Sequence, residues 1–476
     1  MLRRRLPLIL LAAMLPLTAA APAAHAAGPA VEGIAPAFGE SVPDHTIGCP
    51  GNVATVAVTV PPGRTLMIDG RRLGPGSRRL QIALKPGQRF TLRFSGRWTR
   101  THSVRCLPAD FPTWTTTRSG TPQVQWLVFS QVLPPAGAYA IIADAHGVPV
   151  WWHNQPTTER IIDVKVLPDR TVAWTPTALS FFGEGTFARY ALGGGRLPGI
   201  TGVGYKADHH ELIQERGGRY LVLVYRPRDH VDLTTIGGPV DATVLEGEVQ
   251  EVTAAGRLLW SWSMHGHVAL AERSSLSATA MLLHGRIVYD LDHLNAIELD
   301  GPDHLMISAR HEHAVYRIRR STGAIDWKLG GTRTSRSLKV LGDPLGADPF
   351  GGQHDVRLLP DGTITVHDNG TTRNRPPRAV RYRIDRARRT ATLVEDVRDP
   401  RVTTSPGLGS ARRLRGGHWV MSWGGRPFIT ELTPKGRPVL TLTLPNGASY
   451  RAQALEPGFL SAARLRAGMD AMHPRR

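Results

Sequence analysis

The sequence predicts an all-β protein in which a six-bladed β-propeller follows a small, β-sandwich-like domain. Two observations lead to this fold class. Residues 49–106 alternate apolar and polar side chains in short runs separated by turns that contain Gly and Pro. Beyond residue 138 the chain repeats a longer unit of four short strands at a period of roughly 40–60 residues, which is typical of propeller blades. Seven blades are the alternative count.

The chain begins with the features of an export signal. MLRRR is positively charged, LPLILLAAMLPLTAA is apolar, and Ala24-His25-Ala26 forms an A-x-A cleavage site. The apolar run is too short and too rich in Ala and Pro for a stable membrane span, although an uncleaved anchor is the alternative. We therefore expect residues 1–26 to be a signal peptide of an exported protein in the periplasm, cell envelope or extracellular space.

Residues 27–120 are predicted to form the N-terminal β-domain, with the propeller in residues 121–476. Cys49 and Cys106 are the two cysteines of the chain, and they bracket the alternating runs. In an oxidising compartment such a lone pair predicts a disulfide that ties the first and last strands together. Metal binding is the alternative, but neither cysteine has a CxxC partner. The Pro- and Thr-rich residues 107–123 are predicted to be a linker.

The net charge of +19 comes almost wholly from arginine. This charge could attract anionic substrates or acidic surfaces, but we favour the alternative that it reflects arginines scattered over a solvated surface. No basic helix or tract of interleaved basic and aromatic residues is present in the sequence, so we predict no nucleic-acid partner.

The repeating unit has two halves. The first half is an apolar strand, a turn such as LPDG and a second strand, and it occurs five times, beginning near residues 161, 209, 293, 353 and 409. In the second half a turn glycine precedes a large apolar residue by four, as in Gly147 and Trp151, and we expect that residue to pack between blades. The second half near residue 139 lacks a first half. We predict that it closes the ring with a C-terminal strand such as FLSAARLR.

Three repeats carry a polar side chain at the start of their first strand. Aligned on the turn glycines, this position holds His210, Asn295 and His354, while His293 lies two residues before Asn295 on the same face. The first strand of each propeller blade runs beside the central channel, so equivalent positions meet at its mouth. We therefore predict one site there. The alternative is that each imidazole is a structural residue of a turn or core.

Further polar residues near these positions are candidates for the same site. Arg310 lies in the next strand of the middle repeat and is predicted to act with the histidines. Weaker substrate-binding candidates are His209, His311, Asn369 and Ser410. Imidazoles, an arginine and an amide with few carboxylates indicate chemistry on an anion, because these groups direct hydrogen bonds towards negative charge.

The runs DHLNAIELDGPDHLMISARHEHAVYRIRRSTGAIDWKLGG and QHDVRLLPDGTITVHDNG, followed by RAVRYRID, resemble the bacterial arylsulfate sulfotransferases. The resemblance covers about residues 125–445 and is densest from 290 to 385, where the elements H-x-N, S-x-RH, W-x-LGG and QHD-to-DNG occur in order. It implies a six-bladed propeller and sulfuryl transfer from a small phenolic sulfate ester to a phenol acceptor. The transfer would need no nucleotide donor, and we expect no cofactor and no metal.

The resemblance also implies roles for the candidate residues. His354 of the QHD element would be the nucleophile, and His293, Asn295 and Arg310 would bind the sulfuryl oxygens. His210, at the start of an earlier blade, would complete the cradle.

Two further features of the family are less firmly matched. A hydroxyl residue from its last blades has no secure counterpart in this sequence, and Ser410 is our assignment for it. A homodimer through the β-domain is one option for the oligomeric state, which the sequence leaves open.

The residue types suit this chemistry without the resemblance. Sulfuryl transfer is similar to phosphoryl transfer, with a loose transition state whose charge spreads over three equatorial oxygens. We hypothesise that His354 attacks sulfur and expels a phenolate, and that a phenol then takes the group from the sulfohistidine. One of His210 and His293 would protonate the leaving oxygen and deprotonate the acceptor.

Two other functions are weighed against the transferase. The first is a non-catalytic propeller that binds a glycan or peptide on its top face. The second is a metal-dependent lyase or hydrolase that uses His209, His210, His293 and His311, although metal sites usually include carboxylates and no HExxH motif is present. Residues 329–352 form a long segment before His354, and we predict that it covers the channel mouth.

Overall fold

The computed structural model describes most of the chain in nine ranges. They are residues 29–39, 41–95, 100–132, 137–155, 160–177, 185–273, 280–283, 285–445 and 447–475. The predicted signal peptide lies outside these residues. In the described part of the chain, no helix is long and apolar enough to cross a bilayer.

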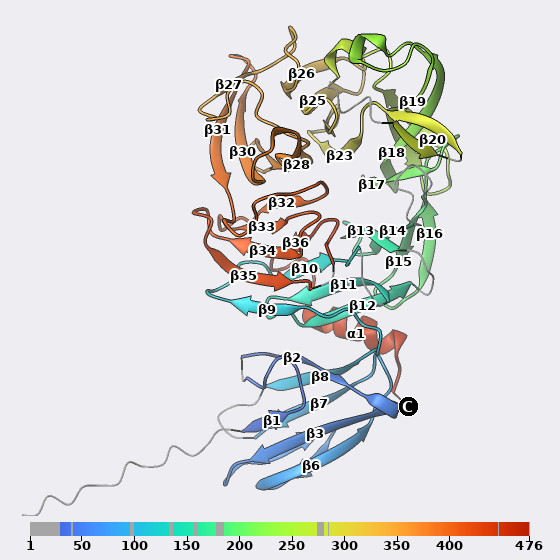
Figure 1. The fold of residues 1–476 in the computed structure, drawn as a ribbon. Helices are drawn as coiled ribbons and strands as arrows, with labels where there is room; N and C mark the ends of the chain where they lie inside the picture. Colours follow the sequence, from blue (N-terminus) through green and yellow to red (C-terminus); the bar gives the residue numbers. More distant parts are fainter. Residues whose placement is uncertain are drawn as a thin grey trace, which may run out of the picture.

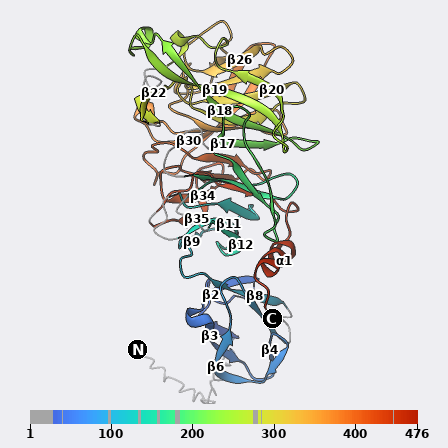
Figure 2. The same cartoon turned by 90° about the vertical axis from the view of Figure 1, so that its right-hand side faces the viewer.

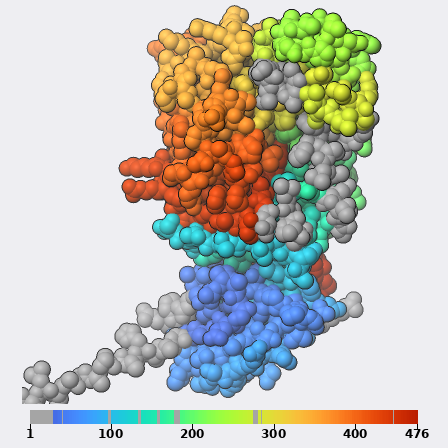
Figure 3. All heavy atoms as spheres, in the orientation of Figure 1, coloured from blue at the N-terminus to red at the C-terminus, as the bar shows by residue number. Residues whose placement is uncertain are grey.

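The N-terminal domain is a sandwich of two sheets, with strand orders β1-β3-β6 and β2-β8-β7-β4-β5. The strands are β1 Ala30–Glu32, β2 Asp44–Gly48, β3 Val53–Val60, β4 Leu66–Ile68, β5 Arg71–Leu73, β6 Gly76–Ala83, β7 Arg89–Phe94 and β8 Thr101–Leu107. Alternate residues such as Val56, Val58 and Phe90 are buried between the sheets, which is the alternation that predicted this domain. The sandwich forms a distinct block beside the larger domain (Figure 3).

Cys49 and Cys106 are joined by a disulfide with their Cα atoms 6.0 Å apart. Cys49 follows β2, and Cys106 belongs to β8, which is the parallel neighbour of β2. The bond therefore links two strands of one sheet, at the entry and the exit of the domain.

The rest of the described chain is built around six four-stranded antiparallel sheets, which makes it a β-propeller. Their strands, written from the channel outwards, are β36 Gln453–Leu455, β10 Trp126–Phe129, β11 Ala138–Asp144 and β12 Pro149–Gln155; β13 Arg160–Val166, β14 Val172–Thr177, β15 Phe187–Tyr190 and β16 Arg196–Ile200; β17 Ala207–Gln214, β18 Arg219–Val231, β19 Ala242–Thr253 and β20 Leu258–Ser263; β23 Leu294–Leu299, β24 His304–Ala309, β25 Ala314–Arg319 and β26 Ile325–Gly330; β28 His354–Leu358, β29 Thr363–Asp368, β30 Arg378–Asp385 and β31 Thr390–Val397; β32 Ser410–Arg413, β33 Trp419–Ser422, β34 Phe428–Leu432 and β35 Pro438–Thr443.

The inner strands β36, β13, β17, β23, β28 and β32 contact one another in this order and return to β36, so they enclose a central channel (Figure 1). A C-terminal strand does close the ring, but it is β36 and not FLSAARLR. That run begins the helix α1, Ala462–Met472, whose first turn is capped when the Ser461 hydroxyl accepts a bond from Arg464 N at 3.2 Å. Ala, Leu, Arg and Met favour a helix once such a cap is present.

The glycines of the second halves act as predicted. Gly147, Gly256 and Gly323 have φ between 71° and 79°, a left-handed conformation that permits the tight turn. The tryptophan that follows Gly147 by four, Trp151, is fully buried and donates from Nε1 to Leu192 O of the next blade at 2.8 Å. These residues therefore build the inter-blade core.

Several segments extend the blades at their outer edges. β9, Thr115–Arg118, pairs with β35, so the segment predicted to be a linker supplies a strand to the propeller before residue 121. β21, Ala280–Leu283, and β22, Arg286–Asp290, extend the sheet of β19. Short 3₁₀ turns lie at Pro50–Asn52, Thr234–Ile236, Leu270–Glu272 and Thr371–Arg373.

The sequence predicted that the segment before His354 covers the channel mouth, but the structure gives it a different course. Its strand β27, Lys339–Leu341, pairs with β31, the outermost strand of its blade. Asp343 then accepts a bond from Arg378 at 2.9 Å, which anchors the segment to the side of the blade. The buried ion pair of Asp343 and Arg378 lies away from the channel, and it explains why the segment follows the side of the blade.

Candidate active site

The inner strands bring three predicted histidines together at one end of the channel. His210 lies in β17 and His354 begins β28, while His293 precedes β23 in a left-handed conformation with φ 46°. The His210 ring centroid lies 4.9 Å from that of His293 and 5.9 Å from that of His354. His209 stacks on His210 at 4.1 Å, and His311 lies 4.8 Å from His293. We call these five residues the histidine cluster.

The hydrogen bonds of His354 fix which of its nitrogens carries the proton. His354 Nδ1 lies 2.8 Å from the carbonyl oxygen of Gly409. A carbonyl can only accept, so Nδ1 is the donor and Nε2 keeps the lone pair of the neutral ring. Nε2 lies 3.5 Å from the Tyr450 hydroxyl inside the cluster. His354 therefore presents a nucleophilic nitrogen to the site.

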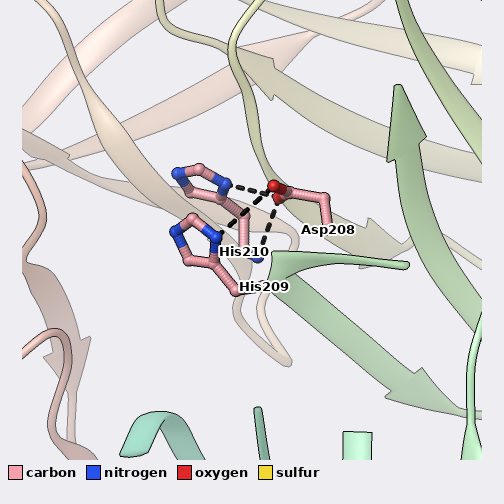
Figure 4. Close-up of side chains that lie close together, drawn as sticks. All are labelled: Asp208, His209 and His210. Atoms are coloured by element: carbon pink, nitrogen blue, oxygen red, sulfur yellow. Dashed lines mark hydrogen bonds and ion pairs between the residues drawn. The ribbon is translucent and has the colours of Figure 1, made fainter. Parts of the chain in front are cut away.

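Asp208 orients the two histidines that follow it. Its Oδ1 lies 2.5 Å from His210 Nδ1 and accepts a bond from His210 N at 2.9 Å, while its Oδ2 lies 3.5 Å from His209 Nδ1. Figure 4 shows the rings stacked, with one nitrogen of each towards the carboxylate and the other away from it. Asp208 is fully buried, so the orientation is rigid.

Asp290 plays the same part for the second pair. Its Oδ2 lies 2.5 Å from His293 Nδ1, and its backbone oxygen lies 2.7 Å from His311 Nδ1. Both bonds engage Nδ1, as in the other members of the cluster. Asp290 thus holds the orientation of both rings through their Nδ1 atoms.

Arg310 lies close to the cluster, as predicted. A Cβ atom added at Gly352 would be 3.2 Å from Arg310 Nη2, so the guanidinium rests on the backbone just before His354. Arg310 Nη2 also donates to Pro406 O at 3.1 Å. Pro406 O and the backbone at Gly352 thereby fix the position of the guanidinium.

Asn295 is fully buried in β23, where its Nδ2 donates to Gln353 O at 2.8 Å and its Oδ1 has no hydrogen-bond partner in the described structure. Asn369 ties the backbone around the site, donating to Gly352 O at 2.9 Å and to Leu408 O at 3.1 Å. It therefore supports the backbone segments that flank His354.

The Ser410 hydroxyl is engaged elsewhere. It accepts from Ala452 N at 3.0 Å and donates to Ala452 O at 3.2 Å, so it joins β32 to the segment before β36. The hydroxyl that approaches the cluster is that of Tyr450, whose ring lies 5.5 Å from His354 and 5.9 Å from His210.

Sequence reasoning missed Tyr450 and its neighbour Arg451. Arg451 is buried, stacks on the Tyr450 ring at 5.1 Å and donates to His210 O at 2.7 Å. It also donates to Asn295 O. The two residues lie in an irregular segment outside the repeats, so no alignment of the repeats could reveal them. Asp208 and Asp290 could have been found, because each lies two or three residues before a cluster histidine.

Burial is the main cause that lowers the pKa of every histidine in the cluster. The pKa of His209, His293 and His311 falls to about 3, and that of His210 and His354 falls well below its ordinary value. Cationic neighbours act in the same direction, with Arg310 beside His293 and Arg451 beside His354. The imidazoles are therefore neutral at pH 7.

Two groups of side chains could also hold a cation. Asp208 with His209 and His210, and Asp290 with His293 and His311, keep their ligand atoms within 4.8 Å of one another. These atoms bond to one another in the structure, and a metal would have to replace those bonds.

Fold and site together define an all-β propeller protein with a buried, neutral histidine cluster at the centre of its ring. The family model of arylsulfotransferases (ASST) matches residues 201–445, which include every histidine of the cluster. The chain belongs to the arylsulfotransferase family, and this membership supports an arylsulfotransferase activity. No curated protein shows detectable similarity to the chain.

Solved structures are similar to the chain only in outline. A Bacteroides caccae protein of unknown function is 12% identical with a TM-score of 0.43 and covers 69% of this chain and 98% of its own. A putative 6-phosphogluconolactonase from Bacteroides fragilis is 10% identical with a TM-score of 0.40 and covers 71% and 100%. The β-propeller domain of Myceliophteria thermophila Cps50 (Swd1) is 12% identical with a TM-score of 0.33 and covers 63% and 88%.

Proposed function

We propose that this protein transfers a sulfuryl group from a phenolic sulfate ester to a phenol through a sulfohistidine at His354, without a nucleotide donor. The observation that carries the proposal is the bond of His354 Nδ1 to Gly409 O, which leaves Nε2 as a neutral nucleophile among other imidazoles. Membership of the arylsulfotransferase family supports the same reaction class.

In the first step His354 Nε2 attacks sulfur, an N–S bond forms and the S–O bond to the aryl group breaks. The sulfuryl oxygens accept bonds from Arg310 and Asn295 and from imidazolium Nε2–H groups. An anionic ester raises the pKa of nearby imidazoles, and Asp208 stabilises the cationic form of His210 at its Nδ1. His210 takes up a proton with the substrate and gives it to the departing phenolate.

In the second step a phenol enters in place of the first product. His210 accepts the proton of the phenol, whose oxygen attacks sulfur as the N–S bond breaks. His354 returns to the neutral form with Nδ1 still bonded to Gly409 O. In this scheme the sulfur is bonded to His354 Nε2. The Tyr450 hydroxyl, which is 3.5 Å from that nitrogen, therefore lies beside the reacting sulfur.

Incubation with 4-nitrophenyl sulfate, with and without a phenol acceptor, tests the proposal. We expect nitrophenol release that depends on the acceptor, a first-turnover burst, and a label on His354 with ³⁵S-labelled donor. His354→Ala should lose transfer by a factor of about 10³ or more, because no nucleophile remains. His304→Ala, in an ordinary propeller strand, is the matched control and should retain activity. Undiminished transfer by His354→Ala would contradict the assignment.

The same assay distinguishes the transferase from the two other functions, a metal-dependent enzyme and a binding module. A metal-dependent enzyme would use the groups around Asp208 and Asp290, so its release of nitrophenol would be abolished by EDTA and restored by a divalent cation. A binding module would give neither a burst nor a labelled histidine. Release that depends on acceptor and withstands EDTA supports the transferase.

A further inference from the structure

The central channel has a second polar region, which lies further along the inner strands and adjoins the histidine cluster at Glu211 and Arg451. The cluster lies at the first residues of the inner strands, whereas a cavity of about 170 Å³ lies towards their later residues. We call it the channel-end pocket. Each inner strand contributes at least one polar or charged side chain to its lining, among them Lys165, Glu211, Glu298, Arg357, Arg412 and Gln453.

The arginines of this pocket share too few carboxylate oxygens. One atom, Asp355 Oδ1, lies 2.8 Å from Arg357 Nη2, 2.7 Å from Arg412 Nη2 and 3.5 Å from Arg451 Nε. Glu211 Oε2 is shared in the same way, at 2.6 Å from Arg357 Nη2 and 3.4 Å from Arg451 Nη1. Arg451 also donates to Asp163, His210 O and Asn295 O, and Arg357 also donates to Ile297 O, whereas Arg412 pairs with the shared Asp355.

Several donors in the pocket consequently have no acceptor. The Nε–H groups of Arg357, Arg412 and Arg451 are buried and lack a hydrogen-bond partner in the described part of the chain. The Arg451 and Arg357 side chains are only 3% and 10% exposed. Buried donors without acceptors are uncommon in native proteins, so their convergence on a cavity points to a ligand that accepts hydrogen bonds.

The charge of the pocket also favours an anion. Lys165, the three arginines and three carboxyl groups line it, and burial raises the pKa of Glu298 to about 7 and raises that of Asp163. Glu298 therefore carries less than full negative charge near neutral pH. The pKa of Arg412 is lowered to about 10, first by burial and next by the adjacent Arg357, as expected where positive charge exceeds its compensation.

We propose that the channel-end pocket binds a small tetrahedral oxyanion of the sulfate or phosphate type, held chiefly by Arg357, Arg412 and Arg451. Guanidinium donors match the oxygens of such an ion in pairs. The cavity is several times larger than the roughly 30 Å³ that one water molecule occupies, so the ion fits. The pocket adjoins the histidine cluster through Arg451, which also donates to His210 O, but the proposal does not depend on the proposed transferase reaction.

Calorimetric titration of the full chain with sodium sulfate, and separately with phosphate, at constant ionic strength tests the proposal. Arg412→Gln should weaken binding of the favoured oxyanion at least tenfold. Arg415→Gln removes the same charge from a side chain that is 88% exposed and should leave binding unchanged. Arg310→Gln, which alters the histidine cluster, should also leave this binding in place. The proposal is overturned if neither ion binds, or if all binding is lost in Arg310→Gln and kept in Arg412→Gln.

A measurement on the unmodified chain removes any dependence on the folding of a variant. Crystals grown with selenate, a heavier tetrahedral oxyanion, should show an anomalous peak within hydrogen-bond distance of Arg357 or Arg412. Water alone in the pocket at saturating selenate would overturn the proposal.

Discussion

The acceptors at Nδ1 distinguish the histidines of the cluster from one another. His354 faces the neutral carbonyl oxygen of Gly409, whereas His210 and His293 face carboxylates. A carbonyl holds the neutral ring in one tautomer, which suits a nucleophile. A carboxylate stabilises the imidazolium, which suits a proton donor. This difference is the reason for giving His354 and His210 separate tasks in the proposed reaction.

Asp208→Asn tests that division of tasks. The amide keeps the size of the side chain but removes the charge that stabilises protonated His210, so we expect kcat/KM to fall about 10²-fold or more. Activity that remains should shift to lower pH, because protonation of His210 becomes harder. Kinetics with 4-nitrophenyl sulfate between pH 5 and 9 would measure both effects. Asp303→Asn, at an exposed turn bonded to Ser321, is the control; equal losses in both variants would refute a specific role for Asp208.

Part of the site could be predicted from the repeats and part could not. His210, Asn295 and His354 occupy equivalent strand positions, so alignment of the turn glycines placed them at one end of the channel. Tyr450 and Arg451 reach the cluster from a segment without repeat register, and only the closed ring brings them there. For Ser410 the sequence identified the strand but not the direction of the side chain. Its hydroxyl bonds to Ala452 instead of facing the cluster.

At the scale of elements, the helix α1 connects the two domains. Its buried Met469 packs against β12 of the propeller, where Trp152 N lies 3.3 Å from the Met469 sulfur. Its last turn faces the sandwich, where Asp470 binds Arg89 at 2.7 Å and Arg105 at 2.9 Å. Figure 2 shows the helix between the two domains. One short element thus sets how the sandwich rests on the propeller.

Asp470→Asn should weaken this connection. Arg105 is almost fully buried and would lose its carboxylate, but Asp470 is 39% exposed, so we expect a loss of about 1–2 kcal/mol in the free energy of unfolding of the sandwich. Calorimetry should show a lower midpoint for the sandwich and an unchanged one for the propeller. Asp385→Asn, which pairs with a guanidinium on a side chain 83% exposed, is the matched control. A sandwich midpoint that does not move would show that the pair contributes nothing to docking.

The elements themselves were predictable to different degrees. Alternation and turn glycines identify the strands of the sandwich and of the blades, because these patterns are local. The helix α1 was missed because FLSAARLR is a short run without a clear period, and the decisive cap at Ser461 lies within it. The course of residues 329–352 depends on the ion pair of Asp343, within the segment, with the distant Arg378, and no local pattern links the two residues.

At the scale of the whole molecule, closing the ring buries a set of imidazoles that titrate normally when the chain unfolds. In the folded protein the pKa of these groups is lowered, by burial first, relative to an unfolded value near 6.5. Each group therefore contributes stability that is fully present above pH 6.5 and is lost as the pH falls below it. The carboxyl groups with raised pKa, such as Glu298, act in the opposite sense between pH 5 and 7.

The contribution of one histidine to the pH dependence of the unfolding free energy can be measured by comparing variants. The pKa of His209 is about 3 in the folded protein, so between pH 6.5 and 5 unfolding takes up nearly one proton at this residue. Replacement by Gln should reduce the dependence of the unfolding free energy on pH by up to about 1.4 kcal/mol per pH unit in that window. Urea unfolding of the propeller at pH 7.5, 6.5, 5.5 and 5 would measure it. His230→Gln, at a side chain 86% exposed, should leave the slope as it is. If His209→Gln has the same slope as the parent, the imidazole is not held neutral by burial, and the electrostatic basis proposed for the whole cluster fails with it.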